Sequence, residues 1–235
     1  MFDITLYQFS RAWDIPNPSP FCMKLEGYLK LGGLPYAVKE LNDPRKAPKG
    51  KVPFVKIDKQ FIGDSEHIYE FLRSHQAIDL DLDLSLEQKS IHHAMITMCD
   101  ESLYFALMYS RWVDDTNWET LRNTLFEGIP ALIRPLVTHQ IRKKIQADLI
   151  AQGMGRHNSA EVYLNGSGHI DALAHYLGNK RWFGGDQPVR LDVVAVSYLV
   201  NILLPPIQSP LKNTVNQHPN LVALAQLGLK EIYGY

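Results

Sequence analysis

Cysteine is scarce in this chain. Only Cys22 and Cys99 occur among 235 residues. They are too far apart in sequence to form a close-spaced redox or metal-binding pair, and two cysteines cannot build a disulfide scaffold. A reducing compartment is therefore the simpler expectation. His92 and His93 lie near Cys99, but these three residues do not make a sound set of metal ligands, so we expect no metal site.

Long apolar runs and an excess of one charge are also missing. The most apolar run, 193–204, is about 12 residues long and carries Asn201, whereas a membrane span needs about 20, so we expect a buried helix and no span. The 24 Lys and Arg balance 25 Asp and Glu, which gives no reason to expect nucleic acid or an anionic membrane as a partner. The first residues show no basic region and no long apolar stretch, so we expect no signal peptide and a cytoplasmic protein.

The most informative local pattern lies in residues 17–26. Ser19 is a good helix N-cap and Pro20 a good first helical residue. Cys22 then falls in the first turn, where unpaired N–H groups and the helix dipole favour negative charge. The stretch predicts either plain capping chemistry or a place for an anion or a thiolate.

The first 75 residues alternate strand and helix patterns. β-branched and aromatic residues predict strands at 4–9 and 36–41 and a hairpin of strands at 54–57 and 60–62. One helix should run from Pro20 to the glycines at 32–33, and a second should begin at Asp64 or Ser65. The pattern predicts a small mixed sheet with helices packed on it.

The rest of the chain has a helical pattern. Residues 76–85 alternate Leu and Asp and are interpreted as a linker whose leucines pack on a neighbour, and Ser85 with Gln88 fits a capping box. Pro130 and Pro135 should kink or divide the second helical stretch. We therefore expect a small α/β domain at 1–77 and an all-helical domain at 85–235. The helical stretches are 86–114, 118–152, 162–177, 191–204 and 219–232.

This order of elements, with its motifs, resembles the glutathione transferase superfamily. The resemblance rests on Ser19-Pro20-Phe21-Cys22, Gly50-Lys51-Val52-Pro53-Phe54, Asp64-Ser65-Glu66-His67-Ile68, Gly185-Asp186-Gln187-Pro188 and His218-Pro219-Asn220-Leu221. It implies an α/β thioredoxin-like N-terminal domain followed by an all-α C-terminal domain. Within the superfamily, the chain most resembles the branch of failed-axon-connections and metaxin proteins. One departure is Val189, which stands where the family usually has a capping Ser or Thr before a buried Asp192, so the local geometry there should differ.

The resemblance implies a glutathione site made of three segments. Val52, before a cis Pro53, would pair its backbone with the cysteinyl part of glutathione, and Lys51 would neutralise the glycyl carboxylate. Ser65 and Asp64 at a helix start would bind the γ-glutamyl group, with simple capping as the alternative.

Two residues compete for the catalytic role. The Ser19 hydroxyl at a helix N-terminus would stabilise the glutathione thiolate, and lowering a thiol pKa by two units takes about 2.7 kcal/mol. Cys22, as a first-turn cysteine with an expected low pKa, would instead form a mixed disulfide with glutathione. Plain capping by Ser19 and plain burial of Cys22 are the structural alternatives.

The expected partners are glutathione, as co-substrate, and a small hydrophobic electrophile. The electrophile would lie between the domains against Tyr104, Met108 and Arg111. Three functions stay open: glutathione transfer, a glutathione-dependent thiol reductase using Cys22, and a non-catalytic binding or scaffold protein, since metaxin-like relatives are associated with membranes or assembly. The family also implies a homodimer.

Overall fold

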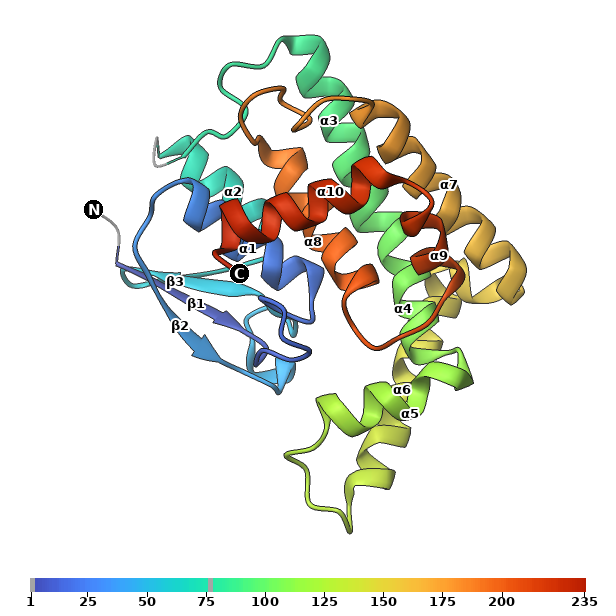
Figure 1. Cartoon of the computed structure of the whole chain (residues 1–235). Coiled ribbons are helices and arrows are strands. Elements are labelled where there is room, and N and C mark those ends of the chain that lie inside the picture. Colours follow the sequence, from blue (N-terminus) through green and yellow to red (C-terminus); the bar gives the residue numbers. More distant parts are fainter. Residues whose placement is uncertain (1–2, 76–77) are drawn as a thin grey trace.

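The computed structural model describes residues 3–75 and 78–235 (Figure 1). The sheet has four strands, β1 (Ile4–Gln8), β2 (Tyr36–Glu40), β3 (Phe54–Ile57) and β4 (Gln60–Gly63), in the order β2-β1-β3-β4. β1 and β2 are parallel, and the other two pairs are antiparallel. The predicted strands and hairpin are confirmed. The predicted domain limit at residue 77 lies outside the described residues.

Two helices accompany the sheet. α1 (Pro20–Leu31) connects the parallel strands β1 and β2, and Gly32 forms its C-cap as predicted. α2 (Ser65–Ser74) follows β4 and is capped by Asp64, whose φ is +86°. A short 3-10 turn, Pro44–Lys46, lies between β2 and β3. Strands and helices together confirm the predicted α/β part of the fold.

The remainder of the described chain is helical. Its helices are α3 (Leu86–Met98), α4 (Tyr104–Trp112), α5 (Asp115–Leu125), α6 (Arg134–Gln152), α7 (Ser159–Leu177), α8 (Arg190–Leu203), α9 (Pro210–Asn216) and α10 (Pro219–Gly228). The π-helical turn Cys99–Leu103 joins α3 to α4, a 3-10 turn, Met154–Arg156, follows α6, and a second π-helical turn, Leu229–Tyr233, follows α10. Ser85 and Gln88 form the predicted capping box. The break between α5 and α6 contains Pro130, as predicted, and Pro135 lies in the first turn of α6. α9 was not predicted, although Ser209 and Pro210 carry the same cap signal as Ser19 and Pro20.

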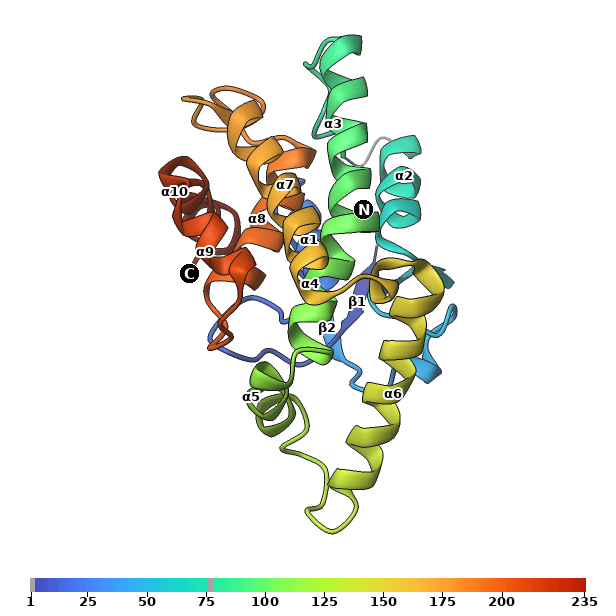
Figure 2. The same cartoon turned by 90° about the vertical axis from the view of Figure 1, so that its right-hand side faces the viewer.

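The central element of the helical part is α8. Residues 190–202 are all buried, which confirms the buried helix predicted from the apolar run. α8 packs against α1 on one side and α10 on another, and Figures 1 and 2 both show it among the other helices. Among the described residues, no helix is both long and apolar enough to cross a membrane.

The start of α8 explains the departure at Val189. Val189 provides no side-chain cap, but the Asp192 carboxylate accepts hydrogen bonds from the N–H groups of Val189 (2.9 Å) and Phe183 (2.7 Å). Half of a capping box is therefore kept. Asp192 closes the helix start and fixes the preceding loop without a hydroxyl at position 189.

Candidate functional site

The first wall of the candidate site is the start of α1. The side-chain amide of Asn17 donates to the Phe9 carbonyl (2.8 Å) and its oxygen accepts from the Ser19 N–H (3.1 Å), which ties the helix start to the end of β1. The Ser19 Oγ accepts the Cys22 N–H at 3.4 Å. Ser19 is thus the predicted N-cap, and it is partly exposed. Its hydroxyl is also within hydrogen-bonding reach of the Cys22 sulfur, a weak acceptor, so donation to a ligand thiolate would replace that contact.

The second candidate nucleophile, Cys22, is wholly buried. It packs in a cluster with Ala47, Val52 and Phe54. Burial raises the pKa of the Cys22 thiol to about 12. The expectation of a low pKa is therefore wrong, because the loss of hydration outweighs the helix N-terminus. A buried thiol of this kind is not poised for disulfide exchange.

The second wall precedes β3. The Val52–Pro53 peptide bond is cis, as the resemblance implied. Phe54 is paired with Gly63 on the antiparallel strand β4 and with Tyr7 on β1. Pro53 precedes Phe54 and Asp64 follows Gly63, so Pro53 and Asp64 lie at the same edge of the sheet. The Val52 side chain is buried, but its backbone N–H and C=O form no hydrogen bond with any described residue. That leaves one donor and one acceptor for an extended peptide.

The third wall is the start of α2. The Asp64 carboxylate accepts the N–H groups of Glu66 (2.9 Å) and His67 (3.3 Å), so Asp64 does the capping. The Ser65 side chain is buried, and its hydroxyl has no hydrogen-bond partner in the described part of the chain. A free hydroxyl in the first turn of a helix is well suited to a carboxylate. Lys51 is exposed beside this edge.

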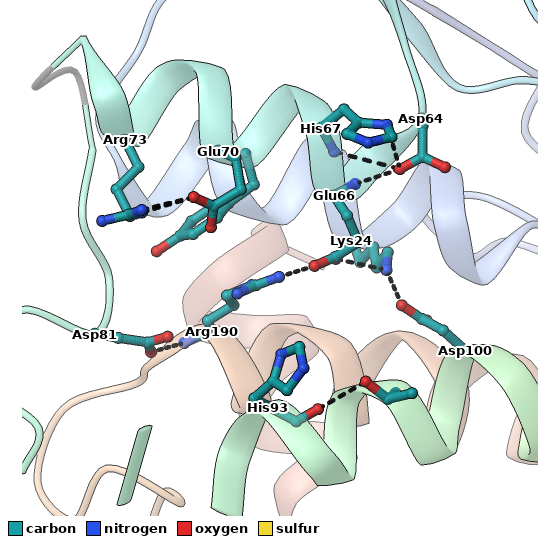
Figure 3. Close-up of polar contacts among 12 residues, drawn as sticks. Lys24, Asp64, Glu66, His67, Glu70, Arg73, Asp81, His93, Asp100 and Arg190 are labelled. Carbon is teal, nitrogen blue, oxygen red and sulfur yellow. Dashed lines mark hydrogen bonds and ion pairs between the residues drawn. The ribbon is translucent and has the colours of Figure 1, made fainter. Parts of the chain in front are cut away.

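A buried ion network lies behind the α2 wall (Figure 3). The Lys24 ammonium pairs with Asp100 and, at 3.0 Å, with Glu66, while Arg190 pairs with the other oxygen of Glu66. The Tyr198 hydroxyl donates to Asp100 at 3.0 Å. The network joins α1, α2, the π-helical turn Cys99–Leu103 and α8. It fixes the first turn of α2 from inside the molecule.

Sequence reasoning missed this network. Lys24 lies between Phe21 and Tyr28 at helical spacing, on the apolar side of α1, and its side chain has no exposed surface. The position of a lysine among apolar residues at helical spacing was the sequence signal that could have predicted its burial. Burial lowers the pKa of Lys24, and Asp100 opposes this shift.

The predicted second-substrate residues lie on α4. The Tyr104 ring contacts the Phe21 ring of α1 edge-on, with centroids 4.8 Å apart, and burial raises the pKa of Tyr104 to about 12. Met108 is partly buried one turn further along α4. Tyr104 therefore lies on the part of α4 that adjoins the start of α1, whereas Met108 packs against the main core and against the cluster of Trp112, Leu121 and Ile207.

The surroundings of Arg111 differ from those of Tyr104 and Met108. Only 4% of it is exposed, and its guanidinium donates to the Pro18 carbonyl (2.7 Å) and to the carbonyl and side chain of Asn201 (2.7 and 2.9 Å). It also stacks on Trp13. This corrects the expectation of a substrate-facing side chain, because both terminal nitrogens are already bound. Arg111 instead holds the loop that leads to Ser19.

Metal ligands are not gathered anywhere in the part of the chain that the structure describes: no three His, Cys, Asp or Glu side chains are placed to hold an ion together. His92 is buried and neither ring nitrogen has a partner among the described residues. The candidate site thus consists of hydroxyl, backbone and carboxylate groups around two helix starts.

Comparison with solved structures supports the fold described above. A glutathione S-transferase from Methylobacterium radiotolerans, in complex with glutathione sulfonate, superimposes with a TM-score of 0.66 at 16% identity, covering 99% of this chain and 92% of that one. At this identity the match shows the fold alone. It confirms the thioredoxin-like sheet followed by an all-helical part.

Sequence comparison shows the family. Residues 20–117 match a glutathione S-transferase N-terminal domain, and residues 166–227 match a glutathione S-transferase C-terminal domain. The chain is 32% identical over 225 residues to the isoprene-epoxide–glutathione S-transferase of Rhodococcus sp. (strain AD45), covering 93% of this chain and 94% of that protein. It is also 32% identical over 232 residues to failed axon connections of Drosophila melanogaster, covering 93% of this chain and 55% of that protein. The chain therefore belongs to the glutathione S-transferase superfamily.

Proposed function

We propose that this protein binds glutathione at the three-walled site and conjugates it to a small hydrophobic electrophile. The observation that carries the proposal is the unpaired backbone of Val52 beside the free hydroxyl of Ser65, at one edge of the sheet. An acidic tripeptide can satisfy both. The similarity to an isoprene-epoxide–glutathione S-transferase supports the reaction class.

In this proposal each group of the site contacts one part of glutathione. The Val52 N–H and C=O pair with the cysteinyl backbone of glutathione, and Ser65 with the α2 start binds the γ-glutamyl carboxylate. Asp64 accepts from the γ-glutamyl ammonium, and Lys51 faces the glycyl carboxylate.

The Ser19 hydroxyl donates to the thiolate. The thiolate sulfur then attacks an electrophilic carbon, a carbon–sulfur bond forms, and the leaving oxygen or halogen takes the electron pair of the bond that breaks. Tyr104 and Met108 are the proposed contacts of the electrophile. Arg111 acts on the site only through the Pro18 loop. The homodimer and the cytoplasmic location expected from the sequence belong to the same proposal.

Glutathione binding tests the proposal directly. We expect the wild-type chain to be retained on immobilised glutathione and Ser65→Ala to bind about tenfold more weakly or worse, because a hydrogen bond to a charged group contributes about 1.5–3 kcal/mol. Ser74→Ala, at the other end of α2, is the matched control. No retention of the wild type would overturn the proposal.

A second measurement separates catalysis from binding alone. The Ser19 hydroxyl already caps α1, which favours a glutathione-binding protein without catalysis as the second candidate. Titration of the thiolate absorbance of bound glutathione distinguishes the two. A thiol pKa well below its usual value of about 8.5 is expected of a transferase, and an unshifted pKa would leave binding only.

A further inference from the structure

Asn201 is a polar residue in the most apolar stretch of the chain. It lies on α8, where residues 190–202 are all buried, and only 1% of Asn201 is exposed. A buried amide has lost its hydrogen bonds to water, so it needs partners within the protein. The proposed function gives Asn201 no task, and its partners indicate one.

Both ends of the Asn201 carboxamide are bound. Its oxygen accepts a hydrogen bond from the Arg111 guanidinium at 2.9 Å, and the Asn201 main-chain carbonyl accepts from the same nitrogen at 2.7 Å. Its nitrogen donates to the Ser197 carbonyl, one turn earlier on α8, at 2.9 Å and to the Asn17 carbonyl at 3.1 Å. The contact with Asn17 connects α8 to the loop before α1.

The residues that lead to Ser19 are held by this set of side chains. Arg111 donates to the Pro18 carbonyl at 2.7 Å. The Asn17 carboxamide accepts the Ser19 N–H at 3.1 Å, while the Asn17 carbonyl is the group bound by Asn201. Since Asn17, Arg111 and Asn201 are each at most 4% exposed, water does not compete for these bonds. The backbone of three successive residues is therefore fixed from inside the molecule.

The Ser19 hydroxyl is held less firmly than its backbone. It accepts the Cys22 N–H at 3.4 Å, which is long for a hydrogen bond, and Ser19 is partly exposed. A displacement of a catalytic group by about 1 Å can lower a rate about 100-fold. The bonds on residues 17–19 therefore decide where the hydroxyl stands.

α8 also reaches the second helix start of the site. Arg190, in the first turn of α8, pairs with Glu66 of α2 (Figure 3). Arg190 and Asn201 lie about three turns apart on the same face of α8, which is about 16 Å along the helix axis. One helix thus contacts both the α1 start, where the thiolate is proposed to form, and the α2 start, where the γ-glutamyl carboxylate is proposed to bind.

We propose that Asn201 is a positioning residue for Ser19: it ties the loop before α1 to α8 and keeps the Ser19 hydroxyl beside the glutathione thiolate. This inference rests on the proposed function, from which it takes the thiolate. Asn201 acts through Asn17 and Arg111. Its loss should therefore raise the pKa of the glutathione thiol and lower kcat, while the walls that bind the rest of glutathione stay intact.

A matched pair of variants separates positioning from stability. Asn201→Ala removes the carboxamide from α8. Asn117→Ala is the control, because Asn117 is 4% exposed and its amide also donates to two carbonyls, those of Ser110 (3.0 Å) and Gln208 (2.8 Å). Both variants lose a buried carboxamide with two donated hydrogen bonds, but only Asn201 binds the loop before α1.

Asn201→Asp isolates the contact with that loop. The carboxylate has nearly the size of the carboxamide and still accepts from Arg111, but it cannot donate to the Asn17 carbonyl. The charge is paired with a guanidinium, so this variant tests the proposal even if Asn201→Ala does not fold.

Two measurements are made on the wild type and all three variants. Hydrogen exchange of peptides covering residues 15–22 reports on the loop without any ligand, and we expect about tenfold faster exchange in both Asn201 variants and no change in Asn117→Ala. With a model aryl halide and glutathione, we expect the Asn201 variants to show about tenfold lower kcat, a bound thiol pKa about one unit higher, and a KM for glutathione within about twofold of the wild type.

Unchanged exchange of residues 15–22 in the Asn201 variants overturns the positioning role. Faster exchange with an unchanged thiol pKa and kcat overturns it as well, because the loop then does not place the hydroxyl. Equal losses of kcat in Asn117→Ala would identify a general effect of stability and would also overturn it. A wild type that is not retained on immobilised glutathione overturns the proposed function instead, and hydrogen exchange then still decides whether Asn201 holds the loop.

Discussion

Lys24 and Glu66 are held 3.0 Å apart across α1 and α2, and the lysine side chain is completely buried. Glu66 follows Ser65 in the first turn of α2. The pair therefore connects the interior of the molecule to the helix start proposed to bind the γ-glutamyl carboxylate. Asp100 of the π-helical turn Cys99–Leu103 and Arg190 of α8 add one charge of each sign, so the network is balanced.

Lys24→Met should destabilise the protein and loosen this helix start. The change leaves Asp100 and Glu66 without their shared cation, and removing one partner of a buried ion pair costs about 3–5 kcal/mol. Urea unfolding measures the loss, and glutathione retention should fall with it. Lys59→Met, at an exposed lysine in the hairpin turn, is the control and should change neither quantity. Equal stability of both variants would show that the network contributes little.

Ser19→Ala should lower conjugation of a model aryl halide by about tenfold or more, because one charge-assisted hydrogen bond to the thiolate is lost. The helix also loses a cap, about 1 kcal/mol. Ser209→Ala controls for this part, since Ser209 also precedes a proline and accepts a third-residue N–H at 3.3 Å, from Lys212. If both variants lose activity equally, Ser19 acts only as a cap.

Cys22 should be unreactive in the folded protein. Burial raises the pKa of its thiol to about 12, so the thiolate is negligible near neutral pH. Mass spectrometry after brief iodoacetamide treatment should show modification of Cys22 only in urea, and Cys22→Ala should keep the conjugating activity. Rapid modification of the native protein would bring back the reductase hypothesis.

Arg111→Met should act on stability rather than on the electrophile. The substitution leaves the Pro18 carbonyl and the Asn201 side-chain oxygen without their buried donor, a loss of about 1–3 kcal/mol for each group. Thermal unfolding measures this, with Arg122→Met on α5 as control. A variant of normal stability with a raised KM for the electrophile would return Arg111 to the second-substrate site.

His92 should make the protein less stable in mild acid. Burial, reinforced by the nearby Lys180, lowers the pKa of His92 from 6.5 to about 4. The folded-state pKa lies below the unfolded one, so stability is fully present above about pH 6.5 and falls towards pH 4, by at most about 1.4 kcal/mol per pH unit. Urea unfolding at several pH values should show this slope.

His92→Phe is the matching variant for that slope. Phenylalanine cannot be protonated, and it keeps an aromatic ring against Tyr176, whose ring centroid lies 5.6 Å from that of His92. We expect the fall in stability between pH 6.5 and pH 4 to become shallower. An unchanged slope would mean that other groups cause it.

Much of the fold was readable because its signals are local. The caps at Ser19, Asp64 and Ser85 each use a side chain and an N–H two or three residues away, so a few letters of sequence contain the whole interaction. The order of strands and helices follows from the same kind of short pattern. The cis Val52–Pro53 bond was expected from a resemblance.

The parts that could not be predicted depend on distant partners. Lys24 meets Glu66 and Asp100, which are 42 and 76 residues away along the chain. Arg111 meets Pro18 across 93 residues. No local pattern reports such contacts, and so Lys24 was overlooked and Arg111 was assigned to a substrate.

The sequence by itself determined where helices begin, which segments are apolar and in what order the elements come. Only the tertiary structure decided the protonation of Cys22, the burial of Lys24 and the task of Arg111. The physical reason is that capping depends on neighbours within one helical turn, whereas desolvation and charge pairing depend on whatever the fold places over a side chain.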